Sequence, residues 1–140
     1  RQHGVAPKED MRMLWRRMVF SILISNTDDH LRNHGFLYDG PDGWRLAPAY
    51  DLNPVPADIK PRVLTTAIDL DDGTASLDLA MSVAAYFELD NARAQEITRE
   101  VGQSVGGWRS EAARAGLGSG QIDRMASAFE HDDLRAALEH

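Results

Sequence analysis

Hydrophobic residues at the start of the chain follow the spacing of one helix face. Seven apolar side chains within residues 11–23 recur at intervals of three and four, as an amphipathic helix requires. Pro7 suits the first position of such a helix, and Glu9 and Asp10 place negative charge at the positive end of its dipole. Residues 19–24 are apolar on nearly all sides, so we expect the helix to end inside the core.

The pattern after this helix and its polar loop is typical of a β-hairpin. Two apolar runs, GFLYD at 35–39 and WRLAPAYDL at 44–52, flank the loop residues GPDG. A hairpin returns the chain to where it began. We therefore expect Tyr50 to Leu52 to lie beside the polar loop at 26–33.

The next segments predict an irregular connection and a short strand. Three prolines in NPVPADIKP, residues 53–61, argue against regular structure there. RVLTTAI at 62–68 is expected to form one strand, and DLDDG at 69–73 a turn.

The remainder of the chain, from Ser76, predicts helices separated by glycines. Asp90 is expected to cap the longest of them, which Gly106 and Gly107 kink or end, and Ser119 is expected to cap the next. The apolar faces are Leu77, Met81, Ala84 and Ala85; then Ile97, Val101, Val105, Trp108 and Ala112; then Ile122, Met125, Ala126 and Phe129. The fold class predicted is mainly α with a small β-hairpin.

Composition narrows the function classes. A chain of 140 residues with 43% hydrophobic content is sufficient for one domain with a buried core. The net charge of −7, without a run of basic residues, argues against direct binding of nucleic acid or of an acidic membrane. Cysteine is absent, and so is any apolar run of roughly 18 residues, so we expect a cytoplasmic protein without a membrane span.

The two ends of the sequence predict a piece of a longer protein. The chain opens on Arg1 instead of methionine. Glu139 and His140 resemble the start of a vector-encoded histidine tag. The expected domain therefore covers residues 1–138, with 139–140 as tag residues.

The densest chemistry lies in SNTDDHLRNHG, residues 25–35. Asp28 and Asn33 have the D-x-x-x-x-N spacing that phosphotransferases use for a base and a metal ligand. A carboxylate can accept the proton of a hydroxyl nucleophile, and Mg²⁺ takes oxygen ligands from an amide and a second carboxylate. The hairpin is expected to bring Asp51 back as that carboxylate. Asp29 is out of register, because His34 stands five residues after it and imidazole suits Mg²⁺ poorly.

Simpler interpretations of the same residues stay open. Asp28 and Asn33 are also the residue types that cap loops by bonding to nearby backbone. His30 could brace the loop as a buried hydrogen-bonding residue. A zinc site of His30, His34 and Asp29 is disfavoured, because the H-E-x-x-H pattern is not matched and Gly35 breaks any helix there.

Residues 18–53 also carry a family pattern, N-x-D-x-H-x-x-N followed by a hairpin and Y-D-L. Its positions are filled by Asn26, Asp28, His30, Asn33, Tyr50, Asp51 and Leu52. The segment resembles the catalytic core of HipA-like serine/threonine kinases, the toxins of bacterial toxin–antitoxin systems. The helical remainder is similar in style to the C-terminal helical lobe of that protein-kinase-like fold.

The resemblance implies roles and partners. Asp28 would be the catalytic base, Asn33 and Asp51 would bind Mg²⁺ and ATP, and His30 would meet the transferred phosphate. The implied reaction transfers the ATP γ-phosphate to a protein Ser/Thr hydroxyl. The implied substrate is an aminoacyl-tRNA synthetase, and the implied partner an antitoxin of the HipB type.

The sequence departs from the family in what it lacks. No glycine-rich phosphate loop is found, because GLGSG at 116–120 follows a helix and is typical of a helix-to-helix turn. With the N-terminal lobe absent, we expect this chain to be inactive alone. Two alternatives remain: a degenerate lobe that serves as a protein-binding module, and a small-molecule phosphotransferase of the aminoglycoside type. The second is weakened because Asn26 replaces its usual histidine two residues before the base.

Overall fold

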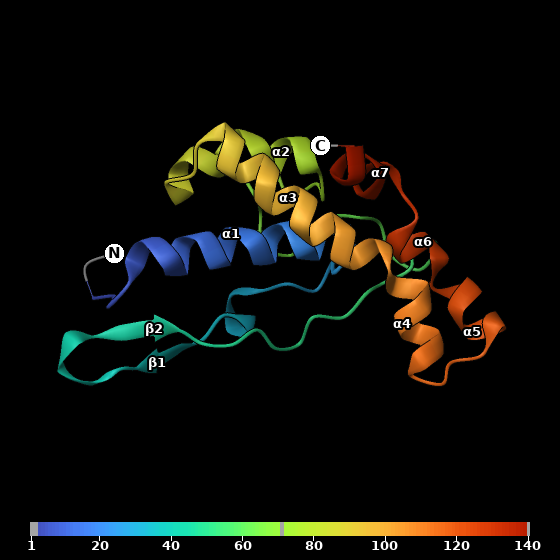
Figure 1. The fold of residues 1–140 in the computed structure, drawn as a ribbon, viewed down its shortest axis with the longest axis horizontal. Coiled ribbons are helices and arrows are strands. Elements are labelled where there is room, and N and C mark those ends of the chain that lie inside the picture. The colour runs from blue at the N-terminus through green and yellow to red at the C-terminus, as the bar shows by residue number, and fades with distance from the viewer. Residues whose placement is uncertain (1–2, 71, 140) are drawn as a thin grey trace.

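Helices make up most of the protein, and two short strands form a small antiparallel sheet (Figure 1). The computed structural model describes residues 3–70 and 72–139. The α-helices are α1 (Pro7–Leu23), α2 (Leu77–Val83), α3 (Asn91–Gly106), α4 (Trp108–Arg114), α5 (Ser119–Arg124), α6 (Ala126–Phe129) and α7 (Asp132–Glu139). The strands are β1 (Phe36–Tyr38) and β2 (Trp44–Leu46), and the 3₁₀ turns are η1 (Leu31–Asn33), η2 (Gly40–Asp42) and η3 (Ala84–Phe87).

The first helix is the centre of the core, and its prediction is confirmed. α1 begins at Pro7 and carries acidic residues in its first turn. Trp15, Val19, Ile22 and Leu23 are fully buried, and the Trp15 indole N–H donates to a backbone carbonyl of α2. Figure 1 shows α3 crossing α1 on one side and the hairpin lying along the other side. The end of α1 is therefore enclosed by the fold.

The predicted hairpin is also confirmed. Phe36 pairs with Leu46, and Tyr38 with Trp44. Two carboxylates of α1 anchor the hairpin: Asp10 accepts from the Arg45 Nε–H (3.1 Å) and from the Leu46 backbone N–H (3.1 Å), and Glu9 accepts from an Arg45 Nη (3.3 Å). This anchor fixes the direction in which the chain leaves β2.

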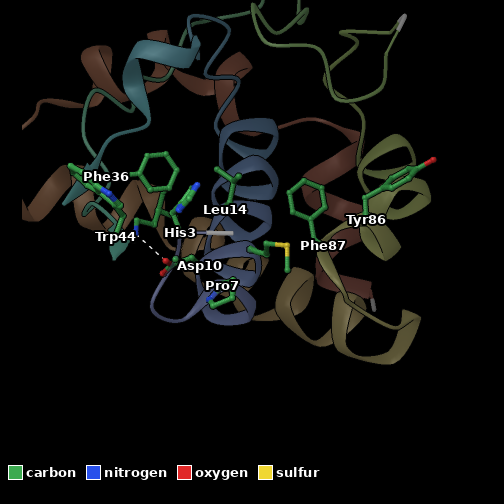
Figure 2. A pocket seen from close by; sticks show the side chains of 11 residues that line it. His3, Pro7, Asp10, Leu14, Phe36, Trp44, Tyr86 and Phe87 are labelled. Carbon is green, nitrogen blue, oxygen red and sulfur yellow. Dashed lines mark hydrogen bonds between the residues drawn. The ribbon is translucent and has the colours of Figure 1, made fainter. Parts of the chain in front are cut away.

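An apolar groove lies between the hairpin and η3, with α1 as its floor (Figure 2). Its volume is about 970 Å³. Phe36 and Trp44 line one side, Leu14 the floor, and Tyr86 and Phe87 the other side. Phe36 and Tyr86 are well exposed, so the groove opens to the surface.

The strand expected at 62–68 is wrong. Within this segment the structure has only an isolated bridge, between Val63 and Thr74. The Thr66 N–H bonds to Asp29 O (2.9 Å), so its hydrogen bond goes to the polar loop instead of a neighbouring strand. The expected turn closes through Ile68 N–H to Asp72 O (3.1 Å), and Asp71 lies outside the described residues.

The C-terminal helices agree with the sequence in part. Asp90 caps α3 by accepting from the Arg93 N–H (2.8 Å), and α3 ends at Gly106 as expected. The cap assigned to Ser119 is wrong, because Gly118 occupies the N-cap position and its N–H bonds to the Gln121 side chain. The last expected face is divided between α5 and α6.

The final helix, α7, was not expected from the pattern. It buries Leu134 and Ala137 against α3 and runs to Glu139, while His140 lies outside the described residues. In the part of the chain that the structure describes, no helix combines the length and the apolar character needed to cross a membrane.

Candidate active site

The candidate site begins at the buried C-terminal end of α1. Ser25 reverses the chain direction with a φ of +54°, and the Asn26 N–H bonds back to Ser21 O (2.8 Å). Ser25, Asn26 and Thr27 are all fully buried. The loop therefore leaves the core from a rigid support.

Asp28 is the first residue of this loop to reach solvent. Asn33, five residues later, is buried, and its side-chain Nδ2 donates to the backbone carbonyl of Asp28 (3.2 Å). That bond uses the amide nitrogen and leaves the amide oxygen available. No described residue donates to the Asp28 carboxylate. The loop-capping interpretation thus holds for the Asn33 nitrogen, whereas the Asp28 carboxylate is left available for a proton.

The Asp29 side chain is buried, unlike that of Asp28. Its carboxylate is paired with His34, with Oδ1 2.8 Å from Nε2, and its backbone carbonyl accepts from the Thr66 N–H and hydroxyl (2.9 and 2.8 Å). Both side chains of the pair are largely buried. Two interactions, each between residues five positions apart, therefore close the loop. The Asn33 amide bonds to the Asp28 carbonyl, and His34 pairs with the Asp29 carboxylate.

His30 lies at the edge of a second, smaller cavity of about 500 Å³, which Leu31, Arg32 and residues 65–67 also line. Its Nδ1 is buried and has no partner among the described residues. The structure therefore does not show the bracing hydrogen bond. Among the described residues no group of three histidines, cysteines or carboxylates forms a metal site, and His34 is already paired with Asp29.

The hairpin brings the Asp51 segment back to this loop, as its topology predicts. The Tyr50 hydroxyl donates to the backbone carbonyl of Arg32 (2.7 Å), next to Asn33. Asp51 has a φ of +57° and is exposed, and its Oδ1 accepts from the Asn53 amide (2.8 Å). Its second carboxylate oxygen remains available.

Two arginines that were not predicted as site residues support the site, and one of them, Arg17, is buried although its simplest sequence interpretation is the solvated face of the first helix. Arg62 donates to Ser25 Oγ (3.0 Å), to Ile22 O at the end of α1 (3.0 Å) and to Asp133 Oδ2 of α7 (2.7 Å). It thereby joins the start of the loop to the C-terminal helix and neutralises a helix C-terminus. No local pattern predicts this, because the partners lie 37 to 71 positions away.

Arg17 is the second of these residues. It is only 7% exposed, and one Nη donates to the backbone carbonyl of Ala47, just after β2. Its Nε and other Nη are buried without a described partner. Burial lowers the pKa of Arg17, and the negative charges of Asp10 and Asp29 oppose that shift.

The oxygen atoms left available suit a magnesium ion. The amide oxygen of Asn33 and one carboxylate oxygen of Asp51 are hard donors, the kind that Mg²⁺ prefers. Two protein ligands fit this ion, because it usually takes its other ligands from water and phosphate. The chemistry of these two donors is therefore compatible with Mg²⁺, and the described residues do not form a site enclosed by protein ligands.

Comparison with known proteins gives a family. The model of the HipA-like C-terminal domain matches residues 1–108. A protein of Haemophilus influenzae described as "Putative kinase" is 37% identical over 51 residues, which are 36% of this chain and 15% of that protein. The match thus spans less than a sixth of that relative's length. No solved structure matches the chain. The chain belongs to the HipA-like C-terminal domain family, and its similarity to the Haemophilus protein relates it to kinases.

Proposed function

We propose that the full-length protein transfers the γ-phosphate of ATP to a serine or threonine hydroxyl of another protein, with Asp28 as the catalytic base. The observation that supports this proposal most is which groups of the loop have partners and which do not. Its buried residues are tied to α1, to Thr66 and to each other, while the Asp28 carboxylate alone among the loop's acids faces solvent without a described partner. A rigid loop that presents one free carboxylate is what proton abstraction from a substrate needs.

The remaining roles follow from the available oxygens. Asn33 and Asp51 would hold Mg²⁺ at the ATP phosphates, and this ion would neutralise the charge that develops in transfer. Asp28 would accept the proton of the attacking hydroxyl. His30, beside the smaller cavity, would face the substrate side of the loop. Each role uses an atom that the fold leaves available.

The larger assembly is part of the proposal. We propose that the order helix, loop, hairpin and aspartate is that of the C-terminal helical lobe of a protein-kinase-like fold, and we assign nucleotide binding to another part of the full-length protein. An aminoacyl-tRNA synthetase as substrate and a HipB-type antitoxin as partner rest on the family resemblance.

The test is Asp28→Asn in the full-length protein, with transfer of labelled γ-phosphate to protein as the assay. Loss of a general base lowers transfer by about 100-fold or more. The matched control is Asp42→Asn, an exposed carboxylate in the turn of the hairpin, which should leave transfer unchanged. Circular dichroism checks that both variants fold. Activity of Asp28→Asn within tenfold of the parent would refute the assignment.

A further inference from the structure

Arg17 contacts the backbone that connects the two halves of the candidate site. One half is the loop that carries Asp28 and Asn33, and the other is the segment that carries Asp51. The Arg17 side chain leaves the middle of α1 and is buried. From there it donates to Ala47 O.

The contact with Ala47 constrains the Asp51 half. Ala47 is buried, and its own N–H bonds to Gly35 O (2.8 Å), just after the loop. Only Pro48 to Tyr50 separate it from Asp51, and proline restricts the backbone there. A shift of Ala47 is therefore transmitted to Asp51 over a short, stiff segment.

The hydrogen bond from the Ala47 N–H to Gly35 O links the same segment to the other half. Gly35 follows His34, which is paired with the buried Asp29 side chain at 2.8 Å. Asp28 precedes Asp29, and Asn33 precedes His34. A displacement of Gly35 is therefore passed through this pair to Asp28 and Asn33.

Stability alone gives a poor reason for an arginine at this position. Burying a guanidinium with two unpartnered nitrogens is unfavourable, and an apolar side chain of similar length avoids that desolvation. The contribution of Arg17 therefore lies in the backbone segment at Ala47 that its hydrogen bond holds in place.

We propose that Arg17 is a positioning residue that sets the distance between the Asp28–Asn33 loop and Asp51, acting through the Ala47 carbonyl and the hydrogen bond from the Ala47 N–H to Gly35 O. This inference rests on the proposed function. It goes beyond that function because it names a side chain to which the proposed reaction assigns no role.

The first experiment uses this chain and amide hydrogen exchange. Arg17→Met is compared with Arg17→Lys and with Arg16→Met, whose arginine is more exposed and pairs with Glu100 of α3. We expect Arg17→Met to speed exchange roughly tenfold in peptides covering 28–34 and 47–53, relative to α3 in the same sample. Arg17→Lys should be intermediate, and Arg16→Met should match the parent. Parent-like exchange in both peptides of Arg17→Met overturns the inference.

The second experiment uses the full-length protein and phosphate transfer at varied Mg²⁺. If Asp51 is displaced, Arg17→Met needs roughly tenfold more Mg²⁺ for half-maximal transfer, and Arg17→Lys recovers part of the loss. General destabilisation lowers the amount of active protein but leaves this concentration unchanged. An unchanged Mg²⁺ requirement overturns positioning while the proposed function stands. A parent protein that transfers no phosphate refutes the proposed function, and the exchange experiment still decides whether Arg17 couples the two segments.

Discussion

The packing of α3 on α7 gives a sharp test of the fold, through Gly102→Ala. Gly102 is buried, and a Cβ added there would lie 2.9 Å from the Ala137 Cβ and 3.2 Å from its backbone carbonyl atoms. Because backbone cannot move aside as a side-chain end can, the helices must separate. Overpacking of this kind costs about 1–3 kcal/mol, against a gain of about 1 kcal/mol for alanine over glycine in a helix.

Gly106→Ala is the matched control on the same helix. Its added Cβ would meet only the Leu138 side chain, at 3.6–3.7 Å, which is ordinary contact. The higher helix propensity of alanine favours both variants. The difference between their free energies of unfolding therefore reports mainly the clash at Gly102. We expect urea unfolding, followed by circular dichroism, to place Gly102→Ala below Gly106→Ala by about 1–3 kcal/mol. Equal stabilities, or a more stable Gly102→Ala, would refute the close approach of α7 to α3.

Three further predictions concern the ion pair of Arg62, the titration of His131 and nucleotide binding by this chain. Arg62→Met should lower the unfolding free energy by about 2–4 kcal/mol, because it breaks a largely buried pair with Asp133, whereas Arg109→Met, which breaks exposed pairs, should cost clearly less; urea unfolding measures both. Burial, reinforced by the charge of Arg62, lowers the pKa of His131, so the folded state favours the neutral ring. Stability should then fall as the pH drops below about 6.5, and His131→Asn, which keeps an acceptor for the Leu134 N–H, should remove that dependence; parallel pH profiles would contradict this. Finally, calorimetry of this 140-residue chain with ATP and Mg²⁺ should show weak binding or none, and submillimolar affinity would show that a second lobe is unnecessary.

Elements governed by local rules were predicted from the sequence. α1 follows from a proline start and a helical apolar face, and the hairpin from two apolar runs around GPDG. The Asp90 cap follows from its side-chain chemistry. In each case the deciding contacts lie within a few residues, so the sequence pattern contains them.

Elements governed by distant partners were not predicted. Residues 62–68 have the apolar character of a strand, but Thr66 bonds to the polar loop nearly forty positions earlier. α7 has only Leu134 and Ala137 as a buried face, and it packs because Gly102 lets it approach α3 closely. No periodicity within α7 reveals a glycine on another helix.

The candidate site combines features that the sequence predicts with features that only the fold provides. Asp28 and Asp29 each have a possible partner five residues on, and the sequence separated them by ligand chemistry, since His34 suits magnesium poorly. The fold separates the same two residues by burial, turning Asp29 inward to His34 and leaving Asp28 at the surface. These two criteria are independent, and both distinguish Asp28, the carboxylate proposed as the base, from Asp29. Neither criterion supplies the relation between the loop and Asp51, which depends on contacts made across the fold. If that relation is what Arg17 maintains, then the residues proposed to perform the chemistry can be found from spacing, whereas the residues that hold them in place require the structure.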